Sequence, residues 1–161
     1  MTETSAGLQS ELLRRHRTAL IFVLAFLALD VFLVVVAYFS AERIFRPVDP
    51  SIVMGLWIAI LVFGLGAFVL RRTRFGAMRL KDIAALRGVS GLLKSLQDTT
   101  IQIAFIGAAV GLMGFLATIF TADWTNMLRA AGVSAIVLIY CFPFRSAWER
   151  TVSQLADYSS G

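Results

Sequence analysis

A single carboxyl group interrupts an apolar stretch that is long enough to cross a membrane. Asp30 lies twelve residues after Thr18 in the run from 18 to 40. A charge near the bilayer centre costs at least about 2.5–3.5 kcal/mol on insertion scales, so an acid at this depth needs a physical reason. Two reasons fit the residue type: the carboxyl binds a proton or a cation inside a helix bundle, or its neutral form donates a hydrogen bond that packs two helices together.

Small residues mark the same depth in later apolar runs. Gly107 and Gly111 are four residues apart, and Gly114 follows them. This spacing lets two helix backbones approach closely in a membrane. Such a face can drive dimerisation, but more often it seats a neighbouring helix of the same bundle. Gly111 and Ser134 lie about as deep as Asp30, so we expect Asp30 to face a glycine-lined surface, with Ser134 as the candidate partner.

Residue types that carry enzymatic or redox chemistry are scarce. The chain has one Cys, Cys141, and one His, His16. A single thiol forms no internal disulfide or CxxC pair, and a single imidazole cannot supply both axial ligands of a bis-histidine haem. Zinc sites use three or four ligands. We therefore expect no cofactor and no metal. No nucleophile–base pair can be assigned either, which favours a protein that is not an enzyme.

Composition and hydropathy define the elements that must position these residues. The chain has 161 residues, 58% of them hydrophobic, and a mean hydropathy of +0.80. A soluble domain is nearer half apolar and lacks apolar runs of about 20 residues. Runs of that kind occupy about 18–40, 51–70, 101–122 and 127–144. These four runs predict an all-α fold, a polytopic membrane protein with a bundle of four transmembrane helices and a cytoplasmic amphipathic helix between the second and third.

The basic residues predict how this domain is oriented. Of the fifteen Lys and Arg residues, twelve lie in 1–17, 71–100 and 145–161; the other three are Arg43 and Arg46, between the first two runs, and Arg129, just inside the outer end of the fourth run. The positive-inside rule then places both termini and 71–100 in the cytoplasm, most simply beneath a bacterial cytoplasmic (inner) membrane. The predicted organisation is a basic N-terminus at 1–17, one membrane domain at 18–144 and a tail at 145–161. The basic residues that give the net charge of +5 are distributed as the predicted membrane topology requires. We therefore expect no nucleic-acid partner.

The segment 71–100 combines a basic cluster with an apolar seam. Arg71, Arg72 and Arg74 are expected to anchor lipid headgroups, each contributing about 1 kcal/mol near anionic lipid. The seam recurs at helical spacing and contains Met78, Ala85, Leu86, Val89, Leu92, Leu93 and Leu96. Contact with lipid, as in an interfacial helix, is the favoured interpretation. A docking surface for a partner protein is the alternative.

These observations favour a small integral membrane subunit or scaffold, which acts through helix–helix contacts and a basic cytoplasmic face. The alternative function is a proton- or cation-coupled transporter or channel component centred on Asp30. The expected partners are a bilayer with anionic headgroups and either a second copy of the chain or another membrane protein.

Overall fold

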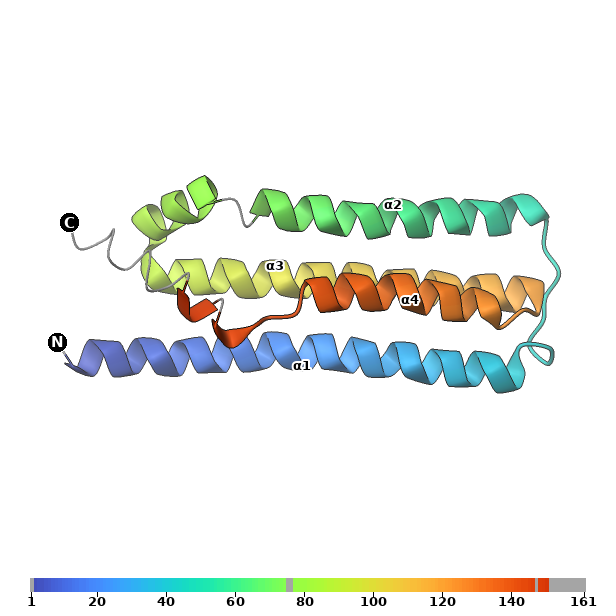
Figure 1. Ribbon diagram of the computed structural model, residues 1–161, viewed down its shortest axis with the longest axis horizontal. Helices are drawn as coiled ribbons and strands as arrows, with labels where there is room; N and C mark the ends of the chain where they lie inside the picture. The colour runs from blue at the N-terminus through green and yellow to red at the C-terminus, as the bar shows by residue number, and fades with distance from the viewer. Residues whose placement is uncertain (1, 75–76, 147, 151–161) are drawn as a thin grey trace.

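The computed structural model describes residues 2–74, 77–146 and 148–150, with the side chains of 2–6, 8, 77–85 and 87 left outside that description. Within these residues the regular elements are helices, which confirms the all-α prediction. The four main helices are α1 (Thr2–Ser40), α2 (Pro50–Arg74), α3 (Ala77–Thr121) and α4 (Thr125–Tyr140), shown in Figure 1.

The helices are arranged around a central pair. α4 packs along the C-terminal part of α3, and α1 and α2 lie on opposite sides of this pair (Figure 1). Both α1 and α2 contact α3 and α4. A side chain on the inward face of α1 can therefore meet two other helices at once.

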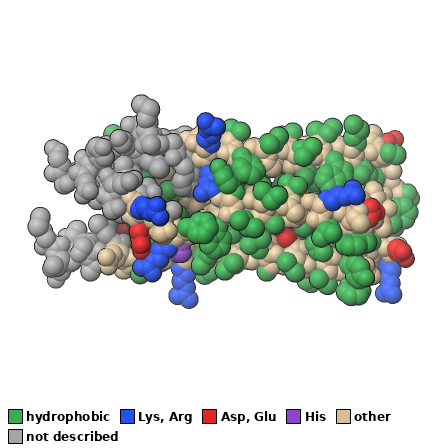
Figure 2. Space-filling model, in the orientation of Figure 1, with side chains coloured by type: hydrophobic (Ala, Val, Ile, Leu, Met, Phe, Trp, Pro, Cys, Tyr) green, Lys and Arg blue, Asp and Glu red, His purple; other side chains and the backbone are tan. Residues whose placement is uncertain are grey.

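Three stretches of helix are long and apolar enough to cross a membrane, namely Gln9–Ser40, Pro50–Arg74 and Gly88–Thr121. They indicate an integral membrane protein. α4 is also apolar but has only 16 residues, a rise of about 24 Å against a hydrocarbon core of about 30 Å. Figure 2 shows apolar side chains along the sides of the bundle, as lipid contact requires.

The two ends of the bundle differ in charge. One end, where α1 begins and α2 finishes, carries Arg14, Arg17, Arg71 and Arg72, and we call it the basic end. The other end, where α1 finishes and α4 begins, is called the loop end. There the backbone N–H of Arg46 donates to the carbonyl of Ile119, with 2.9 Å between nitrogen and oxygen, and so ties the α1–α2 loop to α3.

A short capped turn joins α3 to α4 at the loop end. Ala122 adopts a positive φ of 56°, which stops α3. The hydroxyl of Thr125 donates to Asp123 Oδ2 at 2.7 Å, and its backbone N–H donates to Oδ1 at 2.9 Å. These hydrogen bonds, the side-chain one first, hold the pKa of Asp123 below its ordinary value. The turn thus starts α4 in a defined direction.

At the basic end the helices run past the predicted spans. α1 begins at Thr2 and so includes most of the segment 1–17, which the sequence assigned to a separate N-terminus. Side chains in this segment make contacts within α1 and with α3. Arg15 pairs with Glu11 one turn earlier, at 2.8 Å, and also donates to Gln97 of α3 at 3.3 Å. α4, in contrast, ends at Tyr140 rather than near 144, because Pro143 lacks a backbone N–H and disfavours helix in the residue before it.

α3 changes direction at Gly88 rather than between the predicted amphipathic helix and the third span. Gly88 has φ 66° and ψ −174°, a backbone region that is essentially open only to glycine. From Gly88 to Thr121 the chain is one uninterrupted helix. Residues 89–100, which were assigned to the amphipathic segment, therefore extend the third span.

The favoured interpretation of the seam, contact with lipid, is wrong for three of its residues. Leu92, Leu93 and Leu96 are at most 2% exposed and pack with Leu12 of α1 and with Trp148. The extension of α1 runs beside the extension of α3, so the apolar face of one covers that of the other. Leu86, before the bend, is 83% exposed. The side chains of Met78 and Ala85 lie outside the described residues.

Candidate functional site

Asp30 lies on the inward face of α1 and is 4% exposed. Val23, Leu33 and Ala37 are buried on the same face. Their spacing from Asp30, at seven, three and seven residues, is that of one side of an α-helix. The apolar neighbours therefore turn this side of α1 towards α3 and α4, and the carboxyl is buried with them.

The Asp30 carboxyl meets Ser134 of α4. Ser134 Oγ lies 2.6 Å from Asp30 Oδ2 and 2.8 Å from the carbonyl oxygen of Gly107. Ser134 is fully buried. The structure thus brings together three of the residues that the sequence singled out, and one hydroxyl joins α1, α3 and α4.

Gly111 makes room for the other carboxyl oxygen. A Cβ atom at Gly111 would overlap Asp30 Oδ1. Asp30 Oδ1 is buried and has no hydrogen-bond partner in the structure. The absent side chain of Gly111 is therefore what allows a carboxyl group to fit between α1 and α3.

The other two glycines seat α4 on α3. A Cβ at Gly114 would overlap the Cβ of Ala130, and one at Gly107 would lie 3.0 Å from Cγ of Leu138. Both neighbours belong to α4 of the same chain. The glycine spacing therefore serves packing inside this bundle, with Gly107 and Gly114 against α4 and Gly111 against Asp30.

The basic cluster lies in the last turn of α2. The guanidinium of Arg71 lies 4.2 Å from the ring centroid of Tyr140, which packs against Phe68 at 4.5 Å between centroids. Arg71 therefore contacts the end of α4. Arg72 is exposed and Arg74 is half-buried.

A second polar contact, which the sequence did not predict, lies at the basic end. His16 Nε2 is 2.6 Å from the carbonyl oxygen of Pro143. The carbonyl can only accept, so this nitrogen is the donor. The His16 ring also meets the Trp148 ring edge-on, with 5.7 Å between centroids. An isolated Trp after a helix-ending Pro was the available signal, but it does not identify His16 as the partner.

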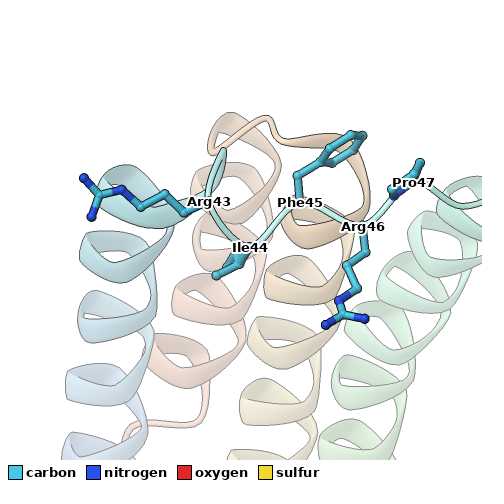
Figure 3. A pocket seen from close by; sticks show the side chains of 5 residues that line it. All are labelled: Arg43, Ile44, Phe45, Arg46 and Pro47. Carbon is cyan, nitrogen blue, oxygen red and sulfur yellow. The ribbon is translucent and has the colours of Figure 1, made fainter.

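A surface hollow at the loop end offers no convergent chemistry. It is lined by Arg43, Ile44, Phe45, Arg46 and Pro47. All five come from one loop, and the side chains of Arg43 and Arg46 point in different directions (Figure 3). The hollow contains no carboxylate, thiol or imidazole that could act with them.

The buried site can hold a proton and join helices, but it lacks the parts of a hydrolytic centre. Ser134 has a carboxyl neighbour and no imidazole neighbour, and no surface of it reaches solvent. Among the described residues, no three His, Cys, Asp or Glu side chains gather as a metal site.

No protein-family model matches the chain, and no curated protein or solved structure matches it.

Proposed function

We propose that this chain is a non-enzymatic subunit or scaffold of a membrane assembly. The observation that carries the proposal is the enclosure of Asp30. One oxygen of its carboxyl contacts Ser134 and the other lies against Gly111. Through Ser134 and Gly111 the carboxyl of α1 holds α3 and α4 together, so its function is to pack helices against one another. The exposed apolar faces and the basic end then remain as the surfaces through which the chain meets lipid and a partner.

The proposal includes four spans, because α4 covers the same depth as its neighbours. At the loop end Trp124, just before α4, packs against Tyr38 at the end of α1, with 5.2 Å between ring centroids. At the basic end Tyr140 packs against Phe68 and lies under Arg71. Aromatic residues at both limits are typical of the two membrane–water interfaces. α4 would therefore run from one interface to the other despite its 16 residues.

We further propose that the basic end faces the cytoplasm of a bacterial cell, beneath the cytoplasmic membrane. Both ends of the described chain lie there, since Leu12 and Trp148 share one cluster. The positive-inside rule gives this orientation, and the exposed Arg72 is placed to meet anionic headgroups. The partner is a second copy of the chain or another membrane protein.

Labelling of intact cells tests the orientation. In a Cys141→Ala background, Phe45→Cys at the loop end should react with a membrane-impermeant maleimide added outside. Leu86→Cys, also at an exposed position, should react only after the membrane is permeabilised. Phe45 and Leu86 are both exposed, at 44% and 83%, so protection of Leu86→Cys in intact cells would report its side of the membrane and not burial in the protein. Labelling of Leu86→Cys in intact cells would overturn the proposed orientation.

Mass measurement tests the subunit role. The chain, extracted in mild detergent and measured by native mass spectrometry, should run as a complex of fixed stoichiometry with itself or with another membrane protein. A monomer at every protein concentration, in detergent and in nanodiscs, would contradict a role as subunit or scaffold.

One observation favours transport as a second candidate function. Asp30 Oδ1 is buried without a hydrogen-bond partner, and an ionisable side chain inside a membrane span is by default a candidate site for a proton or a cation. Proteoliposomes separate the two functions. The subunit proposal expects no proton-driven or cation-driven flux from the wild type. Flux that Asp30→Asn abolishes in a folded protein would replace that proposal with transport.

A further inference from the structure

The hydroxyl of Ser134 has two oxygen neighbours but only one hydrogen. Its distances of 2.6 Å to Asp30 Oδ2 and 2.8 Å to the Gly107 carbonyl are both those of ordinary O–H···O hydrogen bonds. A carbonyl oxygen only accepts, and an ionised carboxylate also only accepts. With an ionised Asp30, one of the two contacts would therefore contain no hydrogen. With a neutral Asp30, the acid donates to Ser134 and Ser134 donates to Gly107.

The environment of the second carboxyl oxygen leads to the same conclusion. Asp30 Oδ1 is buried and receives no hydrogen bond, and its neighbour Gly111 has no side chain that could donate one. In a carboxylate this oxygen would share the negative charge, and a buried, unpaired charge is far more costly than a buried neutral polar atom. In the acid form Oδ1 is an uncharged carbonyl oxygen.

No counter-charge faces the carboxyl from the described parts of the helices packed around it. The nearest charged or titratable residues along α1, α3 and α4 are Arg17, Tyr38, Asp98, Arg129 and Tyr140. Arg17 and Asp98 are each about 20 Å of helix from this level. Arg129 is exposed and, five residues from Ser134, points roughly 140° away from it around the α4 axis. The two tyrosines belong to the aromatic clusters at the bundle ends.

We infer that Asp30 is a proton-binding site in the folded bundle, and that its proton completes a hydrogen-bonded chain from α1 through Ser134 to the Gly107 carbonyl of α3. This inference deepens the proposed function and rests on the packing role assigned there to Asp30. It names the ligand of the site as a proton. Loss of the proton would turn a donor into an acceptor, so that Ser134 could serve only one of its two neighbours and the link across the three helices would break.

Infrared spectroscopy of the full-length protein in nanodiscs tests the inference directly. At neutral pH the difference spectrum between wild type and Asp30→Asn should contain the C=O stretch of a protonated carboxylic acid, and this band should shift in D₂O. A carboxylate band in its place would overturn the inference. Asp30→Asn is the matched variant because its amide can also donate to Ser134.

Stability as a function of pH provides an independent test. If the folded bundle binds the proton more tightly than the unfolded chain, the contribution of Asp30 is full at low pH and is lost as rising pH removes the proton from the folded state. Asp30→Asn has no such proton, so its midpoint of thermal aggregation should stay higher than that of the wild type at alkaline pH. Parallel pH profiles for the two proteins would contradict the inference.

A second variant keeps the test decisive if Asp30→Asn does not fold. In Ser134→Ala the acid loses the acceptor of its hydrogen bond, so the acid band should remain and move in frequency. A spectrum with no acid band in either the wild type or Ser134→Ala would overturn the inference.

All of these readouts use the isolated chain. A protonated Asp30 in a strictly monomeric protein would remove the subunit role alone, whereas an ionised Asp30 in a stoichiometric complex would remove the proton site alone.

Discussion

Gly111→Ala is expected to lower the stability of the bundle, although alanine is by about 1 kcal/mol the better helix former. The new methyl group would overlap Asp30 Oδ1. The carboxyl cannot retreat without giving up its 2.6 Å contact with Ser134. Overpacking of this kind typically costs about 1–3 kcal/mol, and a fall in the midpoint of thermal aggregation in detergent would measure it.

Two further variants test whether the loss comes from the overlap with Asp30 or from replacing any helical glycine by alanine. A Cβ at Gly66 of α2 would meet nothing within 4 Å, so Gly66→Ala should leave the midpoint unchanged or slightly raised. In the double variant Asp30→Ala/Gly111→Ala the oxygen that collides is gone. Its stability should therefore exceed the value obtained by adding the two single losses, as a double-mutant cycle reports. Equal losses in Gly111→Ala and Gly66→Ala would show that the carboxyl does not press on Gly111.

Trp148→Ala should release the segment after α4 from the basic end. Trp148 is 4% exposed and packs against Leu12 and Leu93, with its ring edge-on to His16. Truncation of a buried Trp typically costs about 3–5 kcal/mol. If cleavage follows local opening, trypsin should cut at Arg145 faster by on the order of a hundredfold or more. Limited proteolysis of the detergent-solubilised protein, followed by mass spectrometry, measures this rate.

Phe144→Ala is the matched control for this segment. Phe144 is 57% exposed, so its truncation removes an aromatic ring of the same stretch without opening the cluster. Its cleavage rate should stay near that of the wild type. A Trp148→Ala protein that is cut no faster than the Phe144→Ala protein would mean that the Trp148 cluster does not hold this segment.

Helix boundaries at the loop end could be predicted from the sequence, whereas those at the basic end could not. The end of α1 at Ser40 and the start of α2 at Pro50 agree with the prediction within one residue. Local signals mark this end, since Asp49 accepts from the backbone N–H of Ser51 at 2.8 Å and Pro50 opens the helix. At the basic end the helices continue beyond the apolar runs because α1 and α3 bury each other's side chains there, and no local signal reports that contact.

The sequence by itself also determined the depth of the candidate site. Each residue adds a constant rise to a helix, so counting from the ends of the runs places Asp30, Gly111 and Ser134 at one level. The rotation of each helix about its axis was decided only by the tertiary structure. It aims Asp30 at both Gly111 and Ser134, and it turns Leu93 towards α1 instead of lipid. Rotation depends on how all the packed faces fit together at once, and an apolar face has the same composition whether lipid or another helix covers it.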